Sequence, residues 1–313
     1  MNAPAVTSST FTDSEEWSAV LSDWNLQFRQ LDCGPLQASI DRVISSKLVV
    51  QRVQLSRRFH QCGFAPHGVL TFGIPDLGDS IKWYGDSAHK RSMMNFNRRN
   101  GFDAVSEVGF AANTFSIGSV AFEQEASAMG MPMSVDQVTD SAEQFLVGTA
   151  DLNRMRTIVS GLLTVTARDT FSESIVEELQ NDLIQLLVQS VANPDALTAK
   201  SNYTQRQQAA DRALELIRTS TNTSTLGEIY EYAGVSYRTL NRAFKERFGV
   251  SPKQYIVATR LAEARRALVS SQGSVRITDV ASNWGFWHLG RFARDYKRMF
   301  GELPSDTLNN RDW

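Results

Sequence analysis

The sequence predicts an α+β protein, in which an N-terminal antiparallel β-barrel with flanking helices precedes an all-helical C-terminal domain. Three observations support this prediction. Short segments bounded by turn residues fill residues 36–122, apolar residues then recur at helical spacing, and residues 226–304 contain one helix-turn-helix pattern written twice. With 313 residues, 42% of them hydrophobic, the chain is long enough for about two domains.

Charge is divided unevenly along the chain, although the formal net charge is only -2. From Thr204 onward there are 17 Lys and Arg against 11 Asp and Glu, whereas residues 1–203 contain 15 against 23. A basic C-terminal part suits phosphate binding, and the acidic part before it would be repelled by DNA. We therefore expect a sensing or dimerisation domain over residues 1–192, a linker over 193–203 and a DNA-binding domain over 204–313.

The N-terminus is small and polar, without the basic start and apolar core of a signal peptide, and no apolar run approaches 18 residues. We expect a soluble, cytoplasmic protein with no membrane partner. The two cysteines, Cys33 and Cys62, cannot form a disulfide framework or a Cys-rich zinc site. Buried thiols are the simplest interpretation, with a redox sensor as the alternative.

Residues 14–31 predict an amphipathic helix, because Trp17, Val20, Leu21 and Trp24 share one side. After this segment the sequence pattern changes to short predicted strands separated by Gly, Pro, Asp and Asn, as expected for a barrel or sandwich. The predicted strands are Ala38–Ile44, Leu48–Leu55, Val69–Ile74, Ser92–Phe96, Ala104–Phe110 and Phe115–Phe122.

The predicted barrel is a plausible pocket for a small molecule. The aromatic residues that could line it, or simply fill the core, are Phe59, Phe64, Phe72, Trp83, Tyr84 and Phe96. Its histidines His60, His67 and His89 lack the H-x-H spacing of a metal site, and no nucleotide loop or nucleophile elbow occurs. We therefore expect no metal, no cofactor and no enzymatic activity.

Three helices are predicted after the strands, over residues 134–147, 151–167 and 172–192. In the third, Val176, Leu179, Leu183 and Leu186 recur at intervals of 3, 4 and 3. This stripe fits either a helix that pairs with a second copy of the chain or a helix that packs on the barrel. After the linker, Thr204 and Gln207 form a capping-box pattern that opens a helix over residues 205–220.

The first helix-turn-helix pattern covers residues 226–249. Leu226, Ile229 and Ala233 give a short helix one apolar stripe, and Gly234 and Ser236 supply a turn and a cap for the next helix. In that next helix an apolar residue recurs every four positions, as in a seam that faces a core. The seam residues are Leu240, Phe244 and Phe248.

The opposite face of this second helix is basic. It suits the DNA major groove, where Arg pairs with guanine and Asn with adenine. The candidate DNA-binding residues are Arg238, Asn241 and Arg242 at base edges, with Lys245 nearer a phosphate. Alone, the pattern also fits an ordinary helix with a solvated basic face.

The second pattern, residues 277–301, strengthens the case. Gly285 lies 51 residues beyond Gly234, and the apolar and basic positions of the second helix recur 52 residues on. Arg291 and Arg294 are candidates for base contacts, and Lys297 and Arg298 for the DNA backbone or solvent. We expect Trp284, Phe286 and Trp287 to form the core of its turn, which has no capping residue over 286–288.

Ser251 and Pro252 open a connecting helix that continues to about residue 271. A helix of roughly 20 residues is about 30 Å long. Because successive major-groove faces on one side of DNA lie about 34 Å apart, this helix could place the two recognition helices one turn apart.

Residues 205–308 resemble the DNA-binding domain of the AraC/XylS family of bacterial transcription regulators. The first family motif matches Ser236, Leu240, Arg242, Phe244 and Lys245. The second matches Gly285, Phe286, Phe292, Arg294, Tyr296, Lys297, Phe300, Gly301, Pro304 and Ser305. The sequence departs from the family at Gly290, where Ser is usual, at Tyr296 in place of Phe, and at Thr307 in place of an aromatic residue. The resemblance implies a cupin-like N-terminal barrel and a homodimer formed through the N-terminal half.

We therefore expect a sequence-specific regulator of bacterial promoters, controlled by a small molecule or by dimerisation. Its expected partners are double-stranded promoter DNA, a second copy of the chain and a small-molecule effector, with RNA polymerase as a further candidate. Two alternatives stay open: a ligand-free regulator controlled by protein contacts, and a metallo-cupin enzyme with a DNA-targeting domain.

Overall fold

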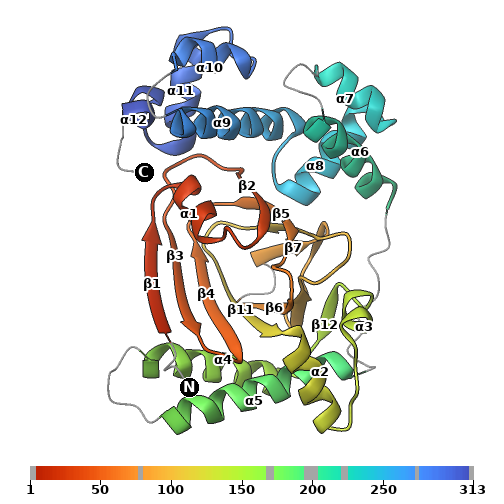
Figure 1. The fold of residues 1–313 in the computed structure, drawn as a ribbon. Helices are drawn as coiled ribbons and strands as arrows, with labels where there is room; N and C mark the ends of the chain where they lie inside the picture. Colours follow the sequence, from red (N-terminus) through yellow and green to blue (C-terminus); the bar gives the residue numbers. More distant parts are fainter. Residues whose placement is uncertain are drawn as a thin grey trace.

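The structure, a computed structural model, describes residues 5–76, 80–166, 173–193, 204–219, 225–271 and 275–309. Two β-sheets face each other in the N-terminal part (Figure 1). Helices α4 (Thr149–Thr166) and α5 (Glu173–Ala192) lie at one end of the sheets, and the helical unit of residues 205–309 lies at the other. In this described part of the chain, no helix is long and apolar enough to cross a membrane.

The larger sheet has seven antiparallel strands in the order β1-β3-β4-β11-β6-β9-β12. Its strands are β1 (Ala5–Phe11), β3 (Ala38–Ile44), β4 (Leu48–Leu55), β6 (Val69–Pro75), β9 (Ser92–Asn95), β11 (Phe110–Gly118) and β12 (Gln144–Leu146). The smaller sheet has the order β2-β5-β10-β7-β8. Its strands are β2 (Asn25–Gln30), β5 (Phe59–Phe64), β7 (Ile81–Trp83), β8 (Asp86–Ser87) and β10 (Phe102–Ser106).

Strand pairings join neighbours within each sheet, and among the described strands none joins one sheet to the other. The N-terminal part is thus a pair of facing antiparallel sheets with flanking helices, and these pairings do not close it into a barrel. The β3–β4 hairpin confirms two predicted strands with their bounds, because Ala38 pairs with Leu55 and Ile44 with Val49.

The helix predicted over residues 14–31 is wrong in its second half. Asp13 caps α1 (Ser14–Val20), accepting hydrogen bonds from the amides of Glu15 at 2.6 Å and Glu16 at 3.2 Å. The chain leaves the helix after Leu21, and Asn25–Gln30 become β2, which pairs with β5. Pairing with a distant strand has overridden the local periodicity, a common outcome for short segments.

Two further predictions are wrong for similar reasons. The strand expected to reach Phe122 ends at Gly118, and α2 (Ser119–Ala128) begins there, so that Phe122 packs from a helix into the core. The helix expected over residues 134–147 is only α3 (Val135–Thr139), capped by Ser134, followed by the short strand β12. Residues 107–109, predicted as strand, form the turn between β10 and β11.

The apolar stripe of α5 packs inside the molecule. Val176, Leu183 and Leu186 are buried beside Phe72 and Phe122, in the core between the larger sheet and the helices. Of the two alternatives that the sequence left open, packing on the sheet is therefore the one observed for this stripe.

A second core lies between the two sheets. Phe28 stacks on Phe59 with ring centroids 4.0 Å apart, and Trp83 stacks on Phe102 at 5.5 Å. A cavity of about 60 Å³ lies inside this core. Of the six aromatic residues predicted to line or fill the barrel, Trp83 and Phe96 line this cavity and Phe59 packs in the same core, whereas Phe72 lies in the other core and Phe64 is 43% exposed.

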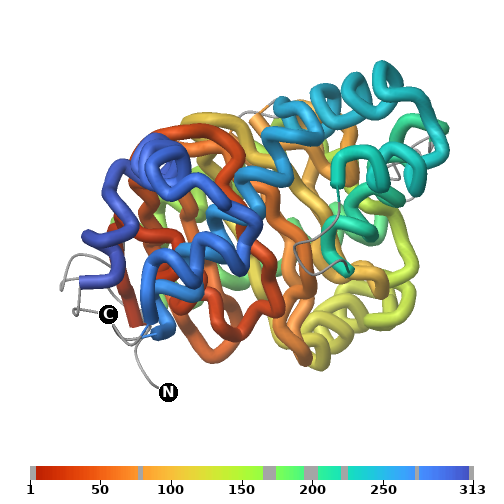
Figure 2. The backbone as a smooth tube through the Cα atoms, turned by 90° about the horizontal axis from the view of Figure 1, so that it is seen from above, coloured from red at the N-terminus to blue at the C-terminus, as the bar shows by residue number. Residues whose placement is uncertain are grey.

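The helical unit contains the predicted helices in the predicted order, followed by a further helix, α12, that the sequence analysis did not predict. They are α6 (Gln205–Thr219), α7 (Leu226–Ala233), α8 (Tyr237–Phe248), α9 (Pro252–Ser270), α10 (Ile277–Asn283), α11 (Leu289–Phe300) and α12 (Pro304–Asn309). Helix α9 lies across the β-sheets, with α6–α8 at one end and α10–α12 at the other (Figure 2). Apart from Asn193, the predicted linker lies outside the described residues.

Candidate nucleic-acid interface

The first helix-turn-helix unit has the turn chemistry that its sequence predicts. Thr225 and Glu228 form a capping box at the start of α7, and Gly234 ends the helix in the left-handed region with φ 67°. Ser236 then caps α8 by accepting a hydrogen bond from the amide of Thr239 at 3.2 Å. These local contacts fix the angle between α7 and α8 and so aim the exposed face of α8.

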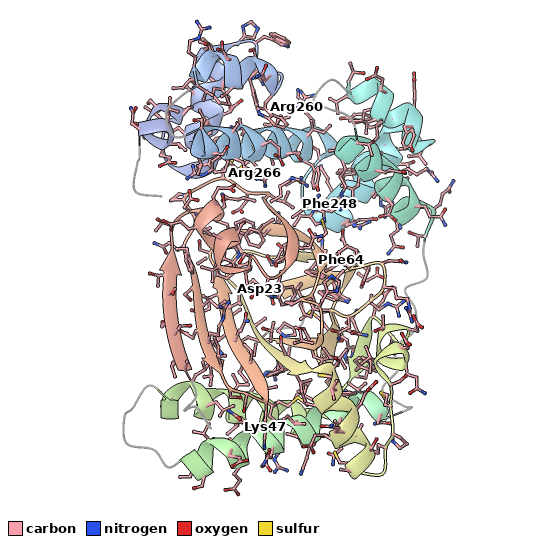
Figure 3. All side chains as sticks on the ribbon, viewed as in Figure 1. Asp23, Lys47, Phe64, Phe248, Arg260 and Arg266 are labelled. Atoms are coloured by element: carbon pink, nitrogen blue, oxygen red, sulfur yellow. The ribbon has the colours of Figure 1, made fainter. Side chains whose placement is uncertain are left out.

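The seam of α8 anchors it to the rest of the unit. Leu240, Phe244 and Phe248 are fully buried, and the rings of Phe244 and Phe248 lie 5.6 Å and 4.9 Å from that of Tyr255 in α9. The predicted role of these residues as a core seam is confirmed. Phe248 lies where α8 meets the β-sheets (Figure 3).

The opposite face of α8 carries its charges toward solvent. Arg238, Arg242 and Lys245 are exposed, and Arg242 pairs with Glu246 at 2.8 Å. A pair this exposed contributes about 0–1 kcal/mol and can break when another partner arrives. Asn241 is half-buried at the flank of the face, and its Oδ1 has no hydrogen-bond partner among the described residues.

The connecting helix α9 begins as predicted. Ser251 and Gln254 form a capping box, and Pro252 occupies the first turn. The helix has 19 residues, which corresponds to a length of about 28 Å. This length is close to the repeat of the DNA major groove, about 34 Å.

In the second unit, Gly285 adopts φ 78° at the turn, and His288 precedes α11 without a side-chain cap, as the sequence predicts. Trp284 and Phe286 pack against the core, whereas Trp287 is 78% exposed. The prediction that Trp287 belongs to the core of the turn is therefore wrong. Its indole lies just before the start of α11.

The outward face of α11 is also basic. Arg291, Arg294, Lys297 and Arg298 are exposed, opposite the buried Phe292 and Tyr296. Asp295 lies 3.5 Å from both Arg291 and Arg298. In the part of the chain that the structure describes, no carboxylate lies within ion-pair distance of Arg238, Lys245, Arg294 or Lys297.

Two departures from the family pattern compensate each other. The hydroxyl groups of Tyr296 and Thr307 lie 2.8 Å apart, and both side chains are buried. A phenylalanine at position 296 would leave Thr307 without this partner, so the tyrosine and the threonine fit as a pair. Burial raises the pKa of Tyr296 to about 12, so that its hydroxyl group stays neutral.

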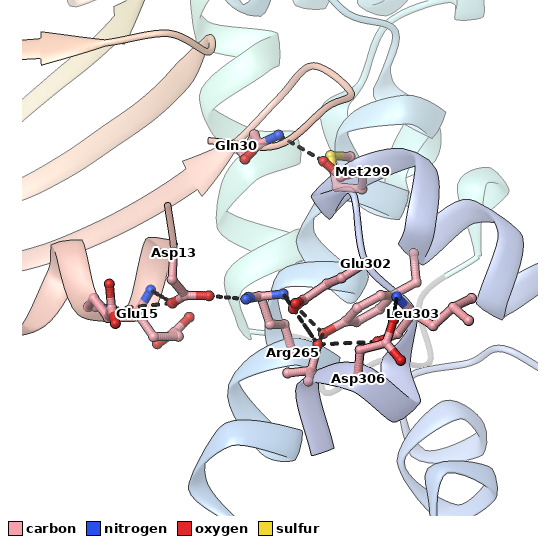
Figure 4. Close-up of polar contacts among 11 residues, drawn as sticks. Asp13, Glu15, Gln30, Arg265, Met299, Glu302, Leu303 and Asp306 are labelled. Carbon is pink, nitrogen blue, oxygen red and sulfur yellow. Dashed lines mark hydrogen bonds and ion pairs between the residues drawn. The ribbon is translucent and has the colours of Figure 1, made fainter. Parts of the chain in front are cut away.

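Arg265 of α9 joins this cluster and links it to the N-terminal part. It donates to Asp13, the cap of α1, and to Glu302 (Figure 4). Nearby, the side-chain amide of Gln30 and the backbone amide of Gly34 donate to the carbonyl oxygen of Met299 at 2.9 Å and 3.1 Å. The end of β2 and the loop after it therefore contact the C-terminal end of α11.

A second buried cluster lies under α8. Arg247 bridges Asp103 of β10 at 3.0 Å and Asp211 of α6 at 2.6 Å. His60 of β5 lies between Asp103, 2.9 Å from Nε2, and Tyr255, whose hydroxyl group is 2.7 Å from Nδ1. Burial alone would raise the pKa of Asp103, but Arg247 and His60 hold it below its usual range.

Sequence reasoning missed both buried arginines. On α8, Arg247 is next to Phe248 on the seam side, and on α9, Arg265 is next to Ala264. Each arginine is a charged residue on the apolar face of its helix. Because such residues are rarely buried without a partner, their position could have indicated a buried ion pair. The partners Asp103 and Asp13 lie far away in the sequence and could not be identified from it.

The histidine in this cluster predicts a pH dependence. Burial lowers the pKa of His60 from 6.5, and Arg29 and Arg247 act in the same direction against Asp103. The unfolded chain therefore binds this proton more readily, so the stability that His60 supplies is complete above about pH 6.5 and is lost below it. We expect the denaturation midpoint to fall as the pH is lowered below about 6.5. His60→Gln should reduce the dependence of the denaturation midpoint on pH. If the dependence is unchanged, groups other than His60 cause it.

Three possible metal ligands lie in the same cluster. Ligand atoms of His60, Cys62 and Asp103 lie within 4.8 Å of one another. Both ring nitrogens of His60 already have partners, and an Arg218 nitrogen lies 3.0 Å from the sulfur of Cys62. Burial raises the pKa of the Cys62 thiol, which favours its neutral form. This environment suits a hydrogen-bonded interface better than a metal site.

The predicted buried state holds for Cys62 but is wrong for Cys33, which is exposed; both thiols are free. His67 and His89 are exposed.

A cavity of about 800 Å³ lies at the junction of the two parts, lined by Cys62 and Arg98 from the N-terminal side and by Arg218 and Arg247 from the helical unit.

Comparison with known proteins finds similarity to regulators. A family described as "Helix-turn-helix domain" matches residues 229–310. The chain is 45% identical over 85 residues to the XylDLEGF operon transcriptional activator of Pseudomonas putida, covering 27% of this chain and 26% of that protein. It thus aligns with about a quarter of the length of that relative.

Two shorter proteins are covered more fully. The chain is 35% identical over 113 residues to XylDLEGF operon transcriptional activator 2 of Pseudomonas putida, spanning 36% of this chain and 72% of that one. The second is a probable AraC family transcriptional regulator from Rhodopseudomonas palustris with a known crystal structure. Its sequence is 34% identical to this chain, the match covers 33% of this chain and 96% of that one, and the TM-score is 0.30. With its two helix-turn-helix units and these relatives, the chain belongs to the AraC/XylS family of transcription regulators.

Proposed function

We propose that this protein is a sequence-specific, DNA-binding transcription regulator of bacterial promoters. The observation that carries the proposal is the pair of exposed basic faces on α8 and α11, each backed by a buried aromatic seam and held at opposite ends of α9. Such helices suit insertion into successive major grooves. Four of their cations have no carboxylate partner among the described residues and are available to DNA.

The roles of individual residues follow from their positions on these faces. In α8 we assign Arg238, Asn241 and Arg242 to base edges and Lys245 to a phosphate. The Oδ1 of Asn241 is buried and has no hydrogen-bond partner among the described residues, so a contact with an adenine edge requires this side chain to turn outward. In α11 we assign Arg291 and Arg294 to bases, and Lys297 and Arg298 to the backbone.

The N-terminal residues 1–192 serve in this proposal as a cupin-like control domain, joined through residues 193–203 to the DNA-binding domain of residues 204–313. Control by a small molecule is supported better by the junction cavity of about 800 Å³ than by the space of about 60 Å³ between the sheets. A ligand in the junction would touch both domains. Thermal stabilisation by a small molecule would support this form of control over control by protein contacts alone.

Dimerisation remains part of the proposal, through a surface other than the buried stripe of α5. The alternative of a metallo-cupin enzyme is disfavoured by the arginines around His60 and Cys62. Stoichiometric iron, manganese or zinc in the purified protein would revive it.

Immunoprecipitation of the native protein with its chromosomal DNA tests the proposal most directly. We expect the recovered sites to share two short elements about one helical turn apart, and their affinity to fall steeply with salt. Recovery of a single element would restrict base reading to one unit. Random recovery with no shared element would contradict sequence-specific binding.

Arg242→Ala should cost about 1–3 kcal/mol at one base pair and relax specificity there, because a bidentate contact with a guanine is lost. Lys297→Ala is the matched comparison, since it also removes one exposed cation from a recognition helix. It should weaken all sequences alike and reduce the salt slope by about 1. Competition binding with single-base variants of the recovered site measures both effects. Equal losses on recovered and random DNA would remove Arg242 from the base-reading residues.

A further inference from the structure

A basic groove of about 340 Å³ lies between α9, α11 and the chain after β2. Helix α9 contributes Lys253 and Val257 to it, α11 contributes Arg294 and Arg298, and the chain after β2 contributes Cys33. We propose that this groove binds a phosphate of the DNA backbone between the two recognition helices, with the N-terminal domain forming one wall. This inference rests on the proposed function and adds a contact to it.

The charge of the groove suits a phosphodiester. Four cations line it, Lys253, Arg291, Arg294 and Arg298, against the single carboxylate of Asp295. Asp295 is engaged with Arg291 and Arg298, each at 3.5 Å. In the described part of the chain, no carboxylate lies within ion-pair distance of Lys253 or Arg294. Lys253 of α9 and Arg298 of α11, which is assigned to the DNA backbone above, supply the charge for a phosphate, and Arg294 remains assigned to a base edge.

The position of the groove identifies the source of that anion. Lys253 is the second residue of α9, four residues beyond the end of the first unit at residue 249, and Arg294 lies in the middle of α11. DNA that places one major groove against α8 and the next against α11 must carry its backbone between the two units. The groove is the cavity that the structure offers at that place.

The N-terminal domain reaches the same groove. Leu31 and Cys33 line it, and the hydrogen bond from the Gly34 amide to the Met299 carbonyl oxygen, 3.1 Å long, holds this loop against α11. The thiol of Cys33 is exposed, whereas that of Cys62 is buried. A DNA backbone in the groove would cover Cys33, so this thiol reports whether the groove is occupied.

Lys253→Ala tests the charge contribution. Because each phosphate contact releases condensed counterions, we expect the slope of log affinity against log salt to lose about 1 unit, with recovered and random duplexes weakened alike. Lys90→Ala is the matched control: it removes one exposed lysine from the loop before β9, which does not line the groove. An unchanged slope for Lys253→Ala would overturn the inference.

Labelling of Cys33 by a fluorescent maleimide tests occupancy in the full-length protein. A saturating promoter duplex should slow the labelling, with Cys33→Ser as the background. Inorganic phosphate at matched ionic strength should not slow it. Unchanged or faster labelling while DNA is bound would contradict phosphate binding in the groove but leave the proposed function standing. Protection by inorganic phosphate alone would mark a free-anion site and also overturn it. Failure to bind any duplex at low salt would overturn the proposed function itself.

Discussion

Replacing Arg247 by methionine is expected to lower the free energy of unfolding by about 3–5 kcal/mol, because the change leaves the carboxylate of Asp103 buried without its strongest partner. Methionine keeps most of the side-chain stem that packs beside Phe248, so that the lost charge dominates the effect. Asp103 would retain His60 at 2.9 Å, and Asp211 is exposed enough to be hydrated. Denaturant unfolding, followed by tryptophan fluorescence, measures the loss.

The double variant Arg247→Met with Asp103→Leu separates the two components of this effect. Replacing both partners by apolar residues is often neutral, so much of the stability should return. The coupling between the two sites would then appear as strong non-additivity in a double-mutant cycle. Additive losses would show that Arg247 and Asp103 act independently, contrary to their 3.0 Å contact.

Phe244→Ala should destabilise the protein by about 3–5 kcal/mol and abolish specific DNA binding. The Phe244 ring is fully buried, 5.1 Å from that of Phe248 and 5.6 Å from that of Tyr255, so its removal leaves a cavity beneath the recognition helix. Calorimetric unfolding and binding to the recovered duplex measure the two losses.

Tyr237→Ala provides the matched control for that cavity. It removes an aromatic ring from the same helix, but the Tyr237 side chain is 63% exposed. Its effect on stability should stay within about 0.5 kcal/mol. A comparable loss from both variants would mean that the helix itself, rather than its seam, limits stability.

The helical unit could be predicted closely because its signals are local. Caps such as Ser236 and Ser251, left-handed turns such as Gly234, and the four-residue spacing of the seam all act within a few residues of each other. The same locality predicts the hairpin of β3 and β4. Their alternating apolar residues and the turn between them lie within one continuous segment.

The features that the sequence did not predict depend mostly on contacts between distant parts of the chain. Residues 25–30 are a strand because β5 pairs with them, and residues 5–11 become an edge strand, although their sequence is mostly polar, because β3 is beside them. The contacts between the domains, through Arg247 and Arg265, bring together residues more than 100 positions apart. Trp287 is exposed although an indole on a turn ordinarily favours burial; exposure there was not predictable from its spacing.

The contacts at the edge of the smaller sheet have a consequence for the DNA that such a regulator reads. Arg29 and His60 hold Tyr255 of α9, Gln30 holds the end of α11, and the ring of Phe248 in α8 lies 5.1 Å from that of His60. Two units joined by a helix could otherwise pivot, and ordering them would cost binding free energy. Docked on one sheet, they are ordered in advance. Operators whose two elements are a base pair closer or farther apart should therefore bind less tightly. Variants that break the contacts between the smaller sheet and the helical unit should relax this preference for one spacing.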